Sequence, residues 1–156
     1  MLYIYKDRDI SVGGGKIYPP NKRLLIGRIE MTIEHGGNTV IVKGNIINVT
    51  LIGAFNEYDA KNVSKKIKKI VEGFNLNKFL MLMNLSNWDG ATPEAFTTSN
   101  EFNEWLNSQN MVAKAIVITS QTVKAIDQQW VPSKLVQNIE YFDNEGEALR
   151  WLEKQL

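Results

Sequence analysis

The chain has 156 residues, of which 44% are hydrophobic, and a chain of this length can bury about 70% of its unfolded surface in one domain without metals or disulfides. The formal net charge of +1, from 18 basic and 17 acidic residues, gives no electrostatic case for a nucleic-acid partner. The absence of cysteine excludes thiol nucleophiles, disulfides and thiolate metal sites.

Residues 1–30 differ from the rest of the chain. They carry six basic and three acidic side chains, a local charge of +3, and include the segment SVGGGKIYPPNKR. Glycines, prolines and basic residues between short apolar runs are typical of a loop that joins edge elements. We therefore predict an N-terminal arm or extra edge element over 1–30, and a regular domain over 31–156.

The first residues, MLYIYKDRDI, place charges at positions 6 to 9, where a signal peptide would need its apolar stretch. No window of the chain approaches the roughly 18 apolar residues of a membrane span. We therefore expect a cytoplasmic protein.

From residue 31 onward the pattern becomes regular. The runs MTIE, TVIVK and IINVTLIGAF predict strands, and the segments HGGN and GN between them are hairpin signals because Gly and Asn accept positive φ. These features predict an antiparallel meander.

Helical and strand patterns alternate after the meander. EYDAKNVSKKIKKIVEGF predicts an amphipathic helix over 57–74, with Gly73 near the expected C-terminal cap. The apolar run KFLMLMNL, 78–85, predicts a central strand covered on both faces.

The C-terminal half continues the alternation. PEAFTTSNEFNEWLNSQ predicts a helix with Thr92 as N-cap and Pro93 at its first position. AKAIVITS and NIEYF predict strands, and QTVKAIDQQW and DNEGEALRWLEKQL predict helices. The predicted fold class is α/β, with a mixed β-sheet whose antiparallel N-terminal meander is followed by alternating helices and strands.

Three segments carry a family resemblance: LIGAFNEYDA entering the first helix, the strand FLMLMNLSNW, and the closing YFDNEGEALRWLEKQL. With the element order, they resemble over about 31–156 the STAS-like family, typified by anti-sigma factor antagonists. The closing segment is similar to that of stand-alone bacterial members of a STAS-like group, which also resembles lipid-binding Sec14-type domains. The resemblance implies a regulatory or binding domain.

Antagonists of this family usually carry a phosphorylatable Ser in an Asp-Ser-Ser/Thr-Gly-type loop after the central strand. The matching stretch here is NWDGATPEA, in which Asp89 is followed by Gly90 and Ala91, and the first hydroxyl is Thr92. This departure argues against phosphorylation of that loop, and Thr92 is better assigned to capping. What the resemblance then implies is a binding module without this phosphorylation.

The loop NLSNWDGATPEA, 84–95, is the candidate site. It follows a central strand, where ligands of open α/β sheets bind, and the next helix N-terminus offers N–H groups to an anion. The alternative is a plain turn at Asp89-Gly90 with Thr92 as cap. The candidate binding residues are Ser86, Asn87, Trp88, Asp89, Gly90 and Thr92.

Catalysis has little support, because the chain has one histidine, His35, and no nucleophile motif or multi-histidine metal pattern. We predict no catalytic residue, metal or cofactor. The alternative is a small-ligand enzyme that uses Asp89 or Glu94 as acid or base. Against it, carboxylates at helix starts are also what the helix dipole favours.

Four lysines, Lys61, Lys65, Lys68 and Lys69, share one face of the first predicted helix. They could attract an anionic lipid or an acidic partner, or form a solvated outer face, which is the commoner role. We therefore expect a protein partner or a small lipid-like or anionic ligand. Peripheral membrane contact has no support, nucleic acid is not expected, and homo-oligomerisation is open.

Two tryptophans have different predicted roles. Trp151 flanks the apolar stripe of the closing helix and is expected to pack on the sheet, so its loss should destabilise by roughly 3 kcal/mol. Trp88 stands between Asn87 and Asp89, where nothing requires burial. We expect its loss to weaken binding more than stability.

Overall fold

The structure is a computed structural model that describes residues 3–6, 11–12, 15–16 and 36–156, with side chains from residue 36 onward. Its strands are β1 (Tyr3–Lys6), β2 (Ser11–Val12), β3 (Gly15–Lys16), β4 (Gly37–Lys43), β5 (Ile46–Phe55), β6 (Phe79–Ala91), β7 (Met111–Val117) and β8 (Ile139–Phe142). The helices are α2 (Glu57–Gly73), α3 (Pro93–Asn107), α4 (Gln121–Trp130), the 3-10 helix η1 (Pro132–Val136) and α5 (Glu145–Glu153).

One mixed sheet organises the molecule, with the strand order β1-β4-β5-β6-β7-β8. The pairs β1–β4 and β4–β5 are antiparallel, whereas β5–β6, β6–β7 and β7–β8 are parallel. The predicted α/β class and mixed sheet are therefore confirmed. β2 and β3 pair only with each other.

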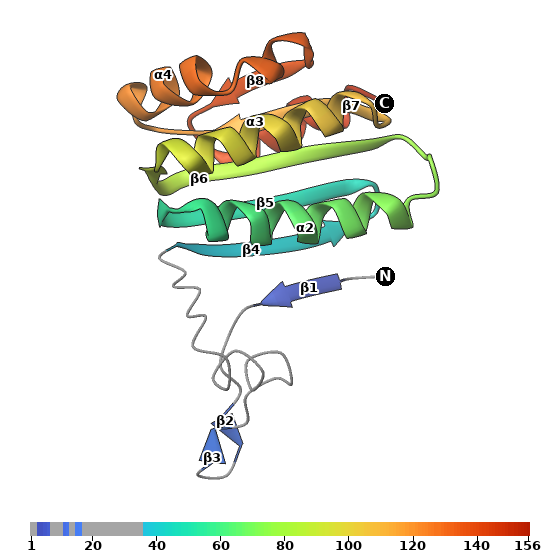
Figure 1. Cartoon of the computed structure of the whole chain (residues 1–156). Helices are drawn as coiled ribbons and strands as arrows, with labels where there is room; N and C mark the ends of the chain where they lie inside the picture. The colour runs from blue at the N-terminus through green and yellow to red at the C-terminus, as the bar shows by residue number, and fades with distance from the viewer. Residues whose placement is uncertain (1–2, 7–10, 13–14, 17–35) are drawn as a thin grey trace.

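Helices cover both faces of this sheet. Figure 1 shows α2 and α3 side by side in front of β4, β5 and β6. The larger cluster of buried side chains lies beneath them, with Ile67, Met81 and Ile116 among its members. A smaller cluster on the opposite face joins β6 and β7 to α5 through Leu80, Ala115 and Leu152. Two apolar layers therefore hold β6 and β7 between helices, as the apolar run 78–85 predicted for β6.

Several predicted boundaries are confirmed. β5 covers the run IINVTLIGAF, α2 begins at Glu57, and α3 begins at Pro93 with Thr92 as its N-cap. The Thr92 hydroxyl oxygen accepts a hydrogen bond from the Ala95 N–H at 3.2 Å. The strand predicted at MTIE and the position of His35 lie outside the described residues.

Gly73 lies at the end of α2, as expected, but it is the last helical residue and not the cap. α2 ends there with Phe74 as its C-cap in a right-handed conformation, and Asn75 and Leu76 take the positive φ values of 50° and 67° instead. The chain thus reverses two residues later than the glycine indicated.

The alternative interpretation of a plain turn at Asp89-Gly90 is wrong, because β6 continues through both residues to Ala91. β5 extends far enough to pair with this segment, with Gly53 opposite Trp88 and Phe55 opposite Ala91. Gly90 has a φ of 106°, so the glycine accommodates an irregular strand and not a chain reversal.

Candidate functional site

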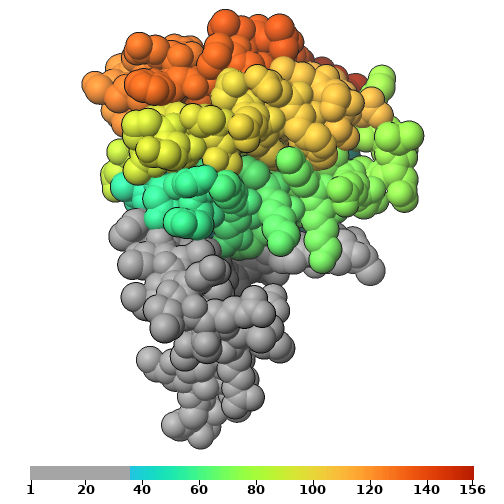
Figure 2. Space-filling view, viewed as in Figure 1, coloured from blue at the N-terminus to red at the C-terminus, as the bar shows by residue number. Residues whose placement is uncertain are grey.

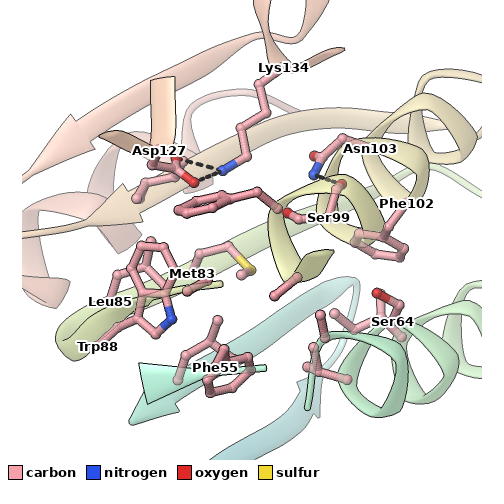
Figure 3. Close-up of a pocket in the computed structure, with 18 of the residues that line it drawn as sticks. Phe55, Ser64, Met83, Leu85, Trp88, Ser99, Phe102, Asn103, Asp127 and Lys134 are labelled. Atoms are coloured by element: carbon pink, nitrogen blue, oxygen red, sulfur yellow. Dashed lines mark hydrogen bonds and ion pairs between the residues drawn. The ribbon is translucent and has the colours of Figure 1, made fainter. Parts of the chain in front are cut away.

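A cavity of about 70 Å³ lies between the sheet and the helices α2 and α3. Its walls are mainly apolar, and much of their surface comes from β5, α2, β6 and α3, with Phe55, Ile67, Met83, Phe96 and Phe102 among the lining side chains. Figure 3 shows several of these side chains pointing into one space. A cavity this large and this apolar can take a small hydrophobic group.

Trp88 forms part of the cavity wall, which corrects the expectation that it stands outside the core. Its side chain is 8% exposed and meets Phe96 edge to face, with 6.1 Å between ring centroids. The indole Nε1 is buried and has no hydrogen-bond partner among the described residues. Figure 3 shows this nitrogen directed toward the interior, on the side of Met83 and Phe55.

A buried N–H without an acceptor is unusual in a protein, since leaving it unpaired costs about 1–3 kcal/mol. The Trp88 indole therefore offers one donor to an acceptor atom that enters the cavity.

Polar side chains lie at another part of the cavity wall. Lys114 of β7, 2% exposed, donates hydrogen bonds to Asn103 Oδ1 at 2.7 Å and to Gln137 Oε1 at 2.8 Å. Burial, and then the charge of Lys134, hold the pKa of Lys114 well below its ordinary value of 10.5, and Asp127 acts in the opposite direction.

Asp127 and Lys134 form a separate ion pair on the cavity wall. The Lys134 ammonium contacts both Asp127 carboxylate oxygens, at 2.8 and 2.6 Å, as the dashed lines in Figure 3 mark. α4 contributes the carboxylate and η1 the ammonium. The opposite charges of this pair offset each other. Among the described residues, the hydrogen-bond acceptors of Lys114 are amide oxygens.

A wider groove of about 590 Å³ runs along the outer surface between α2 and α3, the two helices that lie side by side in Figure 2. Its lining includes the four predicted lysines, Lys61, Lys65, Lys68 and Lys69, together with the carboxylates of Glu72 and Glu101. Ser64 and Phe102 line both this groove and the internal cavity. The two spaces are therefore adjacent at these two residues.

Of the six predicted site residues, only Trp88 lines the cavity. Ser86 donates its hydroxyl to Asn84 Oδ1 at 2.6 Å, Asn87 and Asp89 are exposed, and Thr92 caps α3. Gly90 continues the strand. The structure thus separates Trp88 from the other members of the predicted site.

The alternative enzyme hypothesis assigned acid or base chemistry to Asp89 or Glu94. Both residues are exposed, and neither lines the cavity. No group of three or more His, Cys, Asp or Glu side chains suited to a metal occurs among the described residues. The polar groups that do converge are those around Lys114.

Sequence reasoning missed this polar cluster. One signal was available: Lys114 interrupts the otherwise apolar strand AKAIV, and a lysine inside a buried strand must find partners or lose its charge. Asn103, Gln137 and Asp127 carry no comparable local signal, since each reads as an ordinary polar residue of a helix or turn.

A model of the SpoIIAA-like family matches residues 46–153. The chain belongs to the SpoIIAA-like family. The match spans β5 to α5 and so includes every element that lines the cavity. No curated protein sequence matches the chain.

Two solved structures share the SpoIIAA-like fold. An uncharacterised protein of the DUF3478 family from Shewanella loihica PV-4 is 12% identical, with a TM-score of 0.58, and the match covers 79% of this chain and 98% of that one. The anti-sigma factor antagonist SpoIIAA in its unphosphorylated form is 11% identical, with a TM-score of 0.55 and coverage of 75% and 98%. At these identities the likeness concerns the fold.

No helix in the described part of the chain is long and apolar enough to cross a membrane.

Proposed function

We propose that this SpoIIAA-like protein is a non-enzymatic binding module for a small anionic amphiphile. The apolar part of the ligand occupies the cavity beneath α2 and α3, and its charged end lies in the lysine-lined groove. The observation that carries the proposal is that Ser64 and Phe102 line both spaces. A molecule with one apolar and one anionic end would match an apolar cavity that adjoins a groove with several lysines.

The energetic case rests on the different character of the two spaces. Apolar surface gains about 25 cal/mol per Å² when it leaves water for a lining such as Phe55 and Met83. Lys61 is paired with Glu57, so an anion in the groove would be attracted mainly by Lys65, Lys68 and Lys69. Glu72 and Glu101 of the lining oppose this attraction, and added salt weakens it. Lys68 lies 5.3 Å above the Trp105 ring, so its charged end is held on the α3 side of the groove.

The test is calorimetric titration with octanoate, a short fatty-acid anion. We expect measurable binding that weakens with salt, and no binding of the octyltrimethylammonium cation, which has a similar tail. The double variant Lys65→Glu, Lys68→Glu should lose about tenfold or more in affinity, because it reverses two charges in the groove. Lys78→Glu, exposed and outside the groove lining, is the matched control.

Absence of octanoate binding by the wild-type protein, or equal losses for the groove variant and for Lys78→Glu, would remove the proposal.

A second candidate function is recognition of a protein partner. It is favoured by the exposed apolar side chains of α4 and η1: Trp130 is 47% exposed, and Leu135 and Val136 are each 79% exposed. One structure of the same fold is named an anti-sigma factor antagonist, a name that describes action on another protein.

Native mass spectrometry of the protein purified from its own host separates the two functions. A retained small molecule supports the first, and a stoichiometric protein partner lost on Leu135→Asp supports the second.

A further inference from the structure

Lys114 is the most unusual ionisable group among the described residues. It belongs to β7, lies between the buried Ala113 and Ala115, and is itself 2% exposed. Its side chain nevertheless lines the cavity beneath α3. A ligand in the cavity would therefore meet a primary amine in a largely apolar setting.

The hydrogen bonds of Lys114 match a neutral amine. A neutral amine has two N–H groups and one lone pair, whereas an ammonium has three N–H groups and no lone pair. Lys114 makes two hydrogen bonds, both to amide oxygens, on Asn103 and Gln137. Within the described residues no carboxylate forms an ion pair with it, and both oxygens of Asp127 contact Lys134. In the neutral form these two hydrogen bonds use both N–H groups and leave the lone pair unshared.

The surroundings also favour the neutral form. Burial and the Lys134 charge lower the pKa of Lys114, against the opposing effect of Asp127. An amine is nucleophilic only when it is unprotonated, so a desolvated lysine near another cation is an activated nucleophile.

We propose that Lys114 captures a small aldehyde or ketone in the cavity as a reversible imine. The Nζ lone pair forms a bond to the carbonyl carbon, and the carbon–oxygen π electrons move to the oxygen. The two amine hydrogens leave with that oxygen as one water molecule, and a carbon–nitrogen double bond remains. The step needs no oxidant or reductant, and hydrolysis reverses it.

This inference shares the cavity with the proposed function but not the groove lysines. It adds a ligand class, carbonyl compounds, to the anionic amphiphile. A covalent imine would also give a long residence time to a ligand that is too small to bind tightly through apolar contact alone.

The test uses butanal with sodium cyanoborohydride, which reduces an imine to a stable secondary amine. The full-length protein is treated near neutral pH, digested, and mapped by mass spectrometry as a function of time. We expect the butyl group on Lys114 at least about tenfold faster than on the exposed Lys69, because each unit of lower pKa raises the neutral fraction about tenfold. The wild-type peptide map alone identifies the site, so the result does not depend on a variant that folds.

Lys114→Met is the matched variant, and it should lose the fast butylation while the slow labelling of Lys69 continues. Fast labelling that persists in Lys114→Met, or a wild-type protein in which Lys114 is labelled no faster than Lys69, overturns the proposal. Octanoate titration of the same samples keeps the two hypotheses apart. Octanoate binding without butylation of Lys114 rejects only the imine, and fast butylation without octanoate binding rejects only the amphiphile.

Discussion

Trp88 is packed like a core residue, so its removal should cost stability. Trp88→Ala leaves a void beside Phe96, and we expect a loss of about 3 kcal/mol in the free energy of unfolding. Trp151 is half-buried and packs at a tilt against Phe142, with 5.8 Å between the ring centroids. Trp151→Ala should therefore lose less free energy of unfolding than Trp88→Ala. Urea melts of both variants give the comparison.

Trp88→Phe is the control for the indole N–H. It keeps an aromatic ring but removes the unpaired donor, so we expect a loss below about 1.5 kcal/mol. A Trp88→Ala loss no larger than that of Trp151→Ala would mean that the first tryptophan does not support the cavity wall.

Thr92 stabilises the start of α3 through one hydrogen bond, from the Ala95 N–H to its hydroxyl oxygen. Thr92→Ala should therefore lose about 1 kcal/mol of stability, while Thr92→Ser, which keeps the oxygen, should lose much less. Chemical denaturation measures both. That Thr92 is not a phosphoacceptor stays a prediction, and stoichiometric phosphate on it in host-derived protein would contradict it.

Lys114 should make the stability of the protein depend on pH. Its pKa is lowered in the folded state and returns to about 10.5 on unfolding. Between these two values the unfolded chain binds one more proton, so the free energy of unfolding rises with pH, by up to about 1.4 kcal/mol per unit, until pH 10.5 is passed.

The measurement is the difference in stability between the wild-type protein and Lys114→Met at several alkaline pH values. The difference should shift in favour of the wild type as pH rises, because Met has no proton to release, while the two lost hydrogen bonds to Asn103 and Gln137 contribute a constant offset. A difference that does not vary with pH would show that Lys114 keeps its ordinary pKa.

At the scale of elements, two glycines in open surroundings should respond oppositely to alanine. Neither has an atom within 4 Å of the position a Cβ would take, but Gly90 in β6 has a φ of 106°, whereas Gly73, the last residue of α2, has no positive φ. Gly90→Ala should lose about 1–3 kcal/mol through backbone strain. Gly73→Ala should be neutral, or gain up to about 1 kcal/mol from helix propensity.

Thermal or urea unfolding of Gly73→Ala and Gly90→Ala measures both changes in stability. A destabilising Gly73→Ala would restore the glycine cap that the sequence indicated, and a neutral Gly90→Ala would mean that β6 relaxes without difficulty at this position.

At the scale of the whole molecule, the domain boundary near residue 31 stays a prediction. β1 adds one antiparallel strand beside β4, with Tyr3 opposite Val42 and Lys6 opposite Thr39. The buried clusters of the described residues begin at Val40. Truncation to 31–156 should therefore leave a cooperative urea transition, with β4 as the new edge strand. A truncated chain that is insoluble, or that melts without cooperativity, would show that the arm is part of the fold.

Local sequence patterns predicted most of the elements for identifiable reasons. The apolar arc of α2, the ten-residue run of β5, and the Thr92-Pro93 start of α3 are signals that residues a few positions apart supply. Such signals depend on helical or strand periodicity and on caps, which distant parts of the chain do not alter.

The end of β6 shows where local patterns stop being sufficient. Thr50 pairs with Asn84 and Ile52 pairs with Asn87, so β6 advances three residues over a stretch in which β5 advances two. This bulge changes the phase of the strand, and Leu85 and Trp88 are both buried although they are three apart. Simple alternation from Leu85 would have placed Asn87 inside and Trp88 outside.

The sequence by itself determined the α/β class, the mixed sheet, the order of the elements and the resemblance to the family. The tertiary structure alone decided that Trp88 lines a cavity and that the buried Lys114 has no carboxylate ion-pair partner among the described residues. Lys114 meets Asn103 and Gln137, 11 and 23 residues away in the chain, only because β7, α3 and the residue after η1 pack together. Burial of a polar group is a property of what surrounds it, and those surroundings come from segments that no local pattern connects.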